Sequence, residues 1–356
     1  MNLPAAPARH LVWRSPGEGV ALRLPLRAIA VIALLSALLL AISLLSLATG
    51  TYGVTLDALI ETLRGISVSH AIDNVVWEFR FPRILAAALV GAMMALSGAA
   101  LQNVTRNGLA DPSLVGVSQG AALAVVALTV AVPEAAAFRP WVAFAGAILV
   151  ALLIQALTHT RQGNSSIRFI LMGIGIAAFI SSVTSALMTY GELDRAMAAL
   201  TWLSGAVNAA NWNDVAVLAL ALAILLPLLL GLSRAMAAMR LGDAAAIGLG
   251  APVRLVRYAL VGVAVALAAI ATSVVGPLGF VGLIAPHGAH RLARSGTGLN
   301  LIITALVGAV LVGGADLAGR ALFAPLQIPA GLVTALIGVP VFVWLLGRSQ
   351  RPQAAN

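Results

Sequence analysis

Long apolar stretches alternate with short polar connections along almost the whole chain. A helix needs about 20 apolar residues to cross the hydrocarbon core of a bilayer, and most of the stretches approach or reach that length. The pattern therefore predicts an all-α, polytopic membrane protein with ten transmembrane helices. The predicted segments are Ala28–Leu47, Ile84–Leu101, Leu114–Val132, Trp141–Leu157, Phe169–Met188, Val215–Leu232, Tyr258–Val275, Leu278–Ala289, Leu299–Leu317 and Ile328–Leu346.

Glycine and proline mark two special places in these segments. Gly276-Pro277-Leu278-Gly279 interrupts the apolar run before the short eighth segment, and a broken helix is tolerated where its backbone faces protein or a cavity. Gly91, Ala95 and Gly98 place small residues at steps of three and four. We interpret this spacing as close helix packing rather than as a ligand site.

The arginines indicate the orientation of the helices. All 21 basic residues are arginine, and an N-terminus inside the cell places 15 of them on the cytoplasmic side and 6 outside. Such a bias is typical of membrane proteins, and an odd number of crossings would scramble it. We therefore expect both termini in the cytoplasm, with a tail over 1–27, a transmembrane domain over 28–347 and a second tail over 348–356.

The composition excludes several classes of function. With 61% hydrophobic and 9% charged residues, the chain is not a soluble domain. The absence of cysteine excludes thiol chemistry, and the absence of lysine excludes a P-loop and Schiff-base catalysis. Asp316 is the one acid in the apolar segments, which disfavours a proton-coupled carrier, and no nucleophile–base arrangement indicates an enzyme. A transporter of this kind must take its energy from a partner.

Two polar regions are candidates for contact with partners. In the loop from Met239 to Gly250, Asp243 can cap a short helix and Gly250 can end it, although a plain connector has the same local signals. On the outer side, Arg80, Arg83 and Arg320 offer guanidinium groups that suit partner carboxylates, and they suit lipid headgroups as well. His287 and His290 without a nearby carboxylate indicate a structural role rather than a metal site, and no metal-binding residue is predicted.

Several motifs, in this order, resemble those of the FecCD-type permeases. These are the membrane subunits of bacterial importers for ferric siderophores, haem and cobalamin. The resemblance extends from the second predicted segment to the last. The matching stretches are 80–83, 98–102, 107–112, 116–121, 202–205, 241–250, 276–287, 315–320 and 328–331.

The resemblance implies a multi-pass protein of the bacterial inner membrane that is not an enzyme and binds no cofactor itself. It implies a second permease subunit, identical or paralogous, two cytoplasmic ATPases that use ATP and Mg, and a periplasmic substrate-binding protein, with no nucleic acid. A ferric siderophore is the expected cargo, with haem or cobalamin as alternatives. An ion-coupled secondary transporter is the alternative of another class.

The resemblance also assigns roles to individual residues. Arg80, Arg83 and Arg320 would receive glutamates of the binding protein. The other roles fall on two groups: the coupling helix that meets the ATPase, and the cytoplasmic gate. These are Leu241, Gly242, Asp243, Ala246, Leu249 and Gly250 for the coupling helix, and Asn107, Leu109, Ser165 and Ser166 for the gate.

Three residues depart from the family pattern. Gly108 replaces a usual proline, which we expect to loosen its turn. Asp243 replaces a commoner glutamate in the coupling loop, and Gln327 replaces an acid near Arg320, which removes one outer charge.

Overall fold

Each of the ten predicted apolar segments contains a helix in the computed structural model, which describes residues 10–14, 21–50, 52–158 and 166–349. Within this part of the chain, seven helical stretches are long and apolar enough to cross a membrane. They contain α1, α4, α6, α7, α9, α12 and α14, whereas membrane crossing by α5, α13 and α15 stays a prediction. The bounds are α1 (Leu26–Ala48), α4 (Phe81–Thr105), α5 (Val117–Ala131), α6 (Arg139–Thr158), α7 (Ser166–Tyr190), α9 (Trp212–Gly231), α12 (Val253–Val275), α13 (Val281–Leu292), α14 (Thr297–Ala321) and α15 (Ala330–Ser349).

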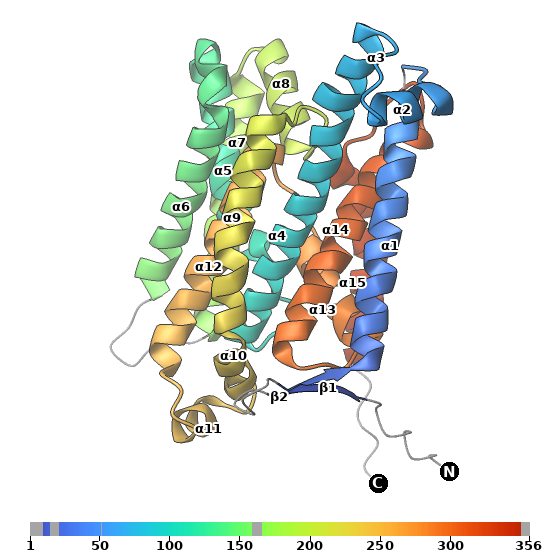
Figure 1. Ribbon diagram of the computed structural model, residues 1–356. Helices are drawn as coiled ribbons and strands as arrows, with labels where there is room; N and C mark the ends of the chain where they lie inside the picture. The colour runs from blue at the N-terminus through green and yellow to red at the C-terminus, as the bar shows by residue number, and fades with distance from the viewer. Residues whose placement is uncertain (1–9, 15–20, 51, 159–165, 350–356) are drawn as a thin grey trace.

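The two ends of the bundle carry different short helices. Helix α1 begins and α15 ends at the end that holds α10 (Ser233–Met239) and α11 (Asp243–Gly248), which we call the α11 end (Figure 1). The opposite end, called the α2 end, holds α2 (Leu56–Leu63), α3 (His70–Asn74) and α8 (Leu193–Leu203). A chain that starts and finishes at one end agrees with an even number of crossings. Which end faces the cytoplasm stays a prediction.

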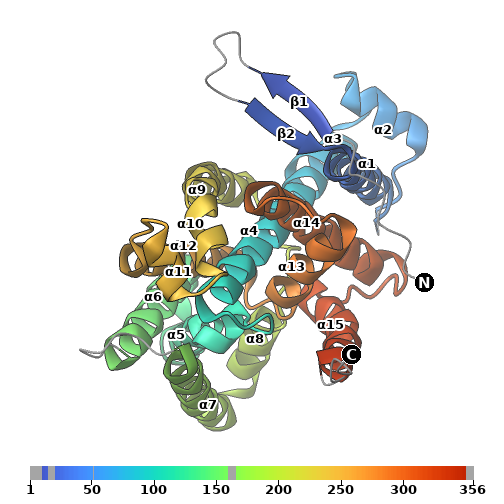
Figure 2. The same cartoon turned by 90° about the horizontal axis from the view of Figure 1, so that it is seen from below.

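Helix α4 is the central helix of the bundle. It packs against α14, α12, α13 and α9, and Figure 2 shows it in the middle of the arrangement. The stretch from His70 to Thr105 is 72% buried over its most apolar window, whereas α1 is 11% buried and lies at the periphery. Most of the α1 surface is therefore available to lipid.

Glycines allow α4 to approach its neighbours at backbone distance. A β-carbon on Gly91 would lie 2.2 Å from the carbonyl oxygen of Gly308 in α14, and one on Gly98 would lie 2.0 Å from that of Gly282 in α13. No side chain fits at such distances. The packing interpretation of these small residues is therefore confirmed.

Three chain segments meet at Gly205, where helical structure is interrupted. The amide of Gly331, at the start of α15, donates to the carbonyl of Gly205 at 2.8 Å, and the amide of Ala206 donates to Val275, the last residue of α12, at 2.8 Å. The predicted break between the seventh and eighth segments is present, with residues 276–280 outside any helix. Gly205 and Gly276 both have positive φ, at 68° and 77°, which favours glycine. We call this meeting point the Gly205 junction.

Some elements have no counterpart among the sequence predictions. Within the predicted N-terminal tail, β1 (His10–Arg14) pairs antiparallel with β2 (Ala21–Pro25), which leads directly into α1. The long second connection forms α2, α3 and a π-helical turn, η1 (Val75–Arg80). Short 3₁₀ turns, η2 (Pro112–Val115) and η3 (Pro133–Phe138), precede α5 and α6.

Candidate functional site

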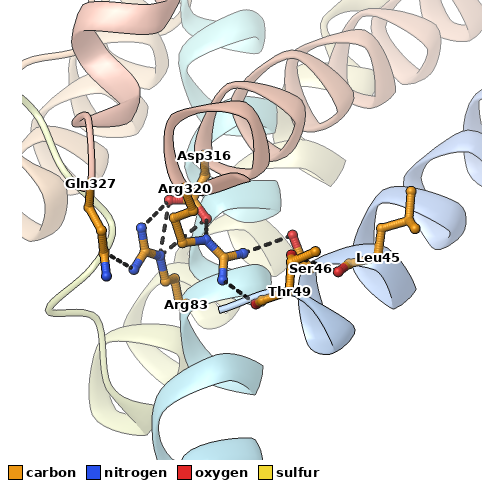
Figure 3. Close-up of polar contacts among 7 residues, drawn as sticks. All are labelled: Leu45, Ser46, Thr49, Arg83, Asp316, Arg320 and Gln327. Atoms are coloured by element: carbon orange, nitrogen blue, oxygen red, sulfur yellow. Dashed lines mark hydrogen bonds and ion pairs between the residues drawn. The ribbon is translucent and has the colours of Figure 1, made fainter. Parts of the chain in front are cut away.

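A buried ion pair joins α4 to α14 at the α2 end. Arg83, in the first turn of α4, donates from Nη2 to Asp316 Oδ1 at 2.8 Å and from Nε to both carboxylate oxygens at 3.0 and 3.1 Å (Figure 3). The side chains are only 12% and 3% exposed. Such bidentate geometry is the strongest form of an arginine–carboxylate contact.

Arg320 and Arg80 extend this cluster towards α1. Arg320 lies one turn after Asp316 and pairs with it at 3.2 Å, while its other nitrogens donate to the Ser46 hydroxyl at 2.9 Å and the Thr49 carbonyl at 3.2 Å (Figure 3). Arg80 donates to the carbonyls of Leu47 and, at 2.7 Å, Tyr52. We call Arg80, Arg83, Asp316 and Arg320 the outer cluster.

The outer cluster contains the three arginines expected to receive glutamates of a binding protein. Their guanidinium groups are engaged within the chain, so a partner carboxylate would have to replace an internal acceptor. Gln327 Oε1 accepts from Arg83 Nη1 at 3.0 Å and takes the place of the missing acid. Arg83 and Arg320 contact the one carboxylate, and the cluster of three arginines and one aspartate therefore keeps a positive charge of two.

At the opposite end, α11 exposes apolar side chains. Leu241, Ile247 and Leu249 are 71%, 63% and 68% exposed, whereas Ala246 is fully buried against the bundle. Gly242 has φ of 110°, a value that a β-carbon disfavours. We call the three exposed side chains the α11 patch. Ile247 was not among the predicted coupling residues, although it lies between two of them.

Asp243 fastens α11 to the rest of the protein. The expectation that it caps the helix is wrong, because it is the first helical residue and its side chain makes no cap. Its carboxylate instead accepts from Arg257 Nη2 in α12 at 2.9 and 3.0 Å and from Arg106 Nη2 at the end of α4. Arg106 also donates to the Met239 carbonyl at 3.2 Å. The short helix is thus linked to two long helices by charge.

The turn that follows α4 contains two of the predicted gate residues. Asn107 Oδ1 accepts from the amide of Leu109 at 3.0 Å, which closes the turn locally, and Arg106 before it has a left-handed φ of 51°. Of the other gate residues, Ser166 begins α7 and Ser165 lies outside the described residues. The structure therefore describes one half of the predicted gate.

Two neighbours of this turn are tightly placed. A β-carbon on Gly108 would lie 3.1 Å from the His287 ring, so the glycine leaves room for that side chain. Asp111 accepts from the amide and the hydroxyl of Ser113 at 2.9 and 2.6 Å. Burial raises the pKa of the Asp111 carboxyl, and the hydrogen bonds from Ser113 act in the opposite direction.

A hollow of about 360 Å³ between α5, α7 and α8 was not predicted. Hydroxyl groups gather on its wall, three of them from α7, at Ser181, Thr184 and Ser185. Their spacing of three and four residues places them on one face of a helix. This spacing was the one signal in the sequence for a polar hollow. It is ambiguous, because hydroxyls in an apolar helix also bond to the backbone of the helix itself, as Thr184 does to the carbonyl of Ile180 at 2.9 Å.

Comparisons with known proteins agree with this architecture. The model of the FecCD transport family matches residues 38–348. The chain is 38% identical over 330 residues to the Fe(3+)-citrate import system permease protein YfmE of Bacillus subtilis (strain 168), covering 92% of this chain and 97% of that protein. It is 38% identical over 282 residues to the iron(3+)-hydroxamate import system permease protein FhuG of the same strain, covering 77% and 84%.

One solved structure extends the agreement to the whole fold. It is described as an inward-facing conformation of an ABC transporter of the metal-chelate type, and it superimposes with a TM-score of 0.77 and 26% identity over 90% of this chain and 99% of that chain. The family match over residues 38–348 and the 38% identity to YfmE over 92% of this chain show that this chain belongs to the FecCD transport family.

Proposed function

We propose that this chain is the permease through which an ATP-driven importer moves a ferric chelate into the cell. The observation that carries the proposal is the family match over residues 38–348. Family membership makes the chain a multi-pass membrane permease of an ABC importer rather than an enzyme. The alternative of an ion-coupled carrier is disfavoured because Asp316, the one acid in the predicted apolar segments, is held by two arginines.

The names of the relatives support a ferric chelate as cargo. YfmE is named for ferric citrate and FhuG for ferric hydroxamate, and both cargoes hold iron through the oxygens of an organic chelator. We propose a ferric siderophore as the cargo of this chain. The hollow between α5, α7 and α8 supports a path for such a polar cargo, because its hydroxyls can exchange hydrogen bonds with a chelate that slides past.

The two ends suit two kinds of partner. Permeases of this type work with a second permease, an ATPase and a binding protein. We propose two ATPases at the α11 end, each receiving one α11 patch, and a periplasmic binding protein at the α2 end. The exposed leucines of the patch support the first contact, and the positive charge of the outer cluster supports the second.

The ATPase contact is tested by co-purification. The chain is extracted from membranes together with the ATPase encoded beside it, as wild type and as a Leu241→Asp/Leu249→Asp variant. Because two charges in an apolar interface have no partners there, we expect the variant to lose the ATPase and the ATP-dependent uptake of ferric chelate. A Leu322→Asp/Leu326→Asp variant is the control for co-purification, since these leucines are 75% exposed and belong to the α2 end, away from the α11 patch.

The outcomes separate the two parts of the proposal. If the wild type brings down the ATPase and takes up haem or cobalamin but no ferric siderophore, the permease role stands and the cargo is wrong. If neither the wild type nor the Leu241→Asp/Leu249→Asp variant binds an ATPase, the importer role fails.

A further inference from the structure

A cavity of about 630 Å³ opens at the α11 end between α4, α10, α13 and α14, and neither the ATPase contact nor the proposed path uses it. Its wall is strongly basic. Arg106, Arg240, Arg291, Arg294, His287 and His290 line it, and no acidic residue is among its lining residues. We propose that this cavity binds the phosphate group of a larger organic molecule.

The arginines are not all occupied by internal partners. Asp243 engages Arg106, and Arg291 stacks over the Trp344 ring at 4.1 Å. Arg240 and Arg294 are exposed and make no hydrogen bond or ion pair with any residue that the structure describes. Each unpaired guanidinium group in this hollow presents a fork of N–H donors that suits phosphate oxygens.

The start of α14 adds donors to the same cavity. Thr297, its first residue, lines the wall, and Gly296 before it supplies no side-chain cap. The first amides of a helix lack partners within the helix and carry a partial positive charge, which favours an anion. A helix of 25 residues has the full dipole.

A buried amide without a partner lies in the wall of the same cavity. Asn300 is 6% exposed and lines the cavity one turn into α14, yet its side-chain nitrogen has no hydrogen-bond partner in the described part of the chain. A buried donor without a partner destabilises the folded protein. An anion that reaches the end of α14 would accept from it. The amide thus points to a ligand independently of the arginines and the helix end.

The size and the remaining wall define the ligand class. The volume falls within the roughly 300–1,000 Å³ of organic ligand sites. Ala99, Met236, Pro286 and Leu301 supply apolar surface beside the arginines, which suits an organic group attached to the phosphate. The headgroup of an anionic phospholipid and a soluble phosphoester share this chemistry.

Binding is measured on the purified full-length chain in neutral detergent with phosphatidylcholine. The probes are phosphatidylglycerol in mixed micelles, ATP without magnesium, and inorganic phosphate, each titrated while the thermal midpoint is followed. We expect phosphatidylglycerol or ATP to raise the midpoint, and the probe that does so identifies the lipid or the soluble source. If no probe raises the midpoint, or if inorganic phosphate alone does so, the proposal of an organic phosphate site is overturned.

A charge-matched pair of variants tests the location. In Arg240→Gln/Arg294→Gln, the two exposed and unpaired arginines are lost, so folding is preserved and we expect the apparent Kd to rise about tenfold or more, because each charged hydrogen bond contributes about 1.5–3 kcal/mol. In Arg234→Gln/Arg254→Gln, two exposed arginines outside the cavity lining are lost, and we expect the Kd to change less than about twofold. An equal loss in both variants would indicate diffuse attraction and overturn the site.

Discussion

The two ends of this permease use arginine in opposite ways. At the α2 end, the arginines of the outer cluster are buried around Asp316 and their nitrogens bond to the chain itself. At the α11 end, Arg240 and Arg294 are exposed and have no ion-pair partner among the described residues. A buried charge must be paired to be tolerated, whereas an exposed one is free to meet a ligand. Burial therefore separates arginines whose donors hold helices together from arginines whose donors are free for a ligand.

The largest effect is expected from removing the charge at the centre of the outer cluster. Asp316→Asn leaves Arg83 and Arg320 buried without a counter-ion, and breaking a buried pair in this way costs about 3–5 kcal/mol. Chemical unfolding of the purified protein in detergent measures the loss. Asp194→Asn, at an exposed acid of the same end, is the control and should change little. A loss below about 1 kcal/mol for Asp316→Asn would mean that the cluster acts as a surface pair.

A functional rather than a structural effect is expected at the other end. Asp243 is 43% exposed, so Asp243→Asn should cost no more than about 1 kcal/mol of stability. The substitution weakens the contacts of α11 with Arg257 and Arg106, and we therefore expect ATP-dependent uptake to fall several-fold. Uptake into vesicles and the melting temperature are measured on the same preparation. A large drop in melting temperature with normal uptake would show that Asp243, like the outer cluster, stabilises the fold and is not needed for uptake.

The smallest effect is expected from restoring an acid near the outer cluster. Gln327→Glu adds a carboxylate that faces Arg83 at an exposed position, with a gain of about 0–1 kcal/mol in stability. The same change lowers the positive charge offered to a binding protein, so we expect slower association that depends less on salt. Association kinetics at two salt concentrations test this. Gln327→Ala keeps the charge of the wild type and separates charge from hydrogen bonding.

The helices could be predicted from the sequence because apolar length is a local property. The ten segments coincide with helices, and the short α11 and the break before α13 lie where Gly250 and Gly276 indicate them. The hairpin of β1 and β2 was missed, since two strands of five residues give a weak signal.

The partners of charged residues could not be predicted in the same way. Arg83 and Asp316 are 233 residues apart, and no local pattern joins them. Asp243 looks like a helix cap in the sequence, but Arg106 and Arg257 reach it from α4 and α12. Those long-range pairings decide which of the predicted docking and coupling residues are free to contact a partner.

The Gly205 junction has a consequence for how such permeases diversify. The bonds from Ala206 to Val275 and from Gly331 to Gly205 join backbone atoms, so they persist whatever side chains surround them. Neighbouring positions can therefore change over generations to suit another cargo without breaking the backbone hydrogen bonds that hold α12 and α15 at the junction. Substitutions should accumulate slowly at Gly205 and Gly276, because a β-carbon there would lie 2.2 and 2.4 Å from a carbonyl oxygen. They should accumulate faster at the positions around these two glycines.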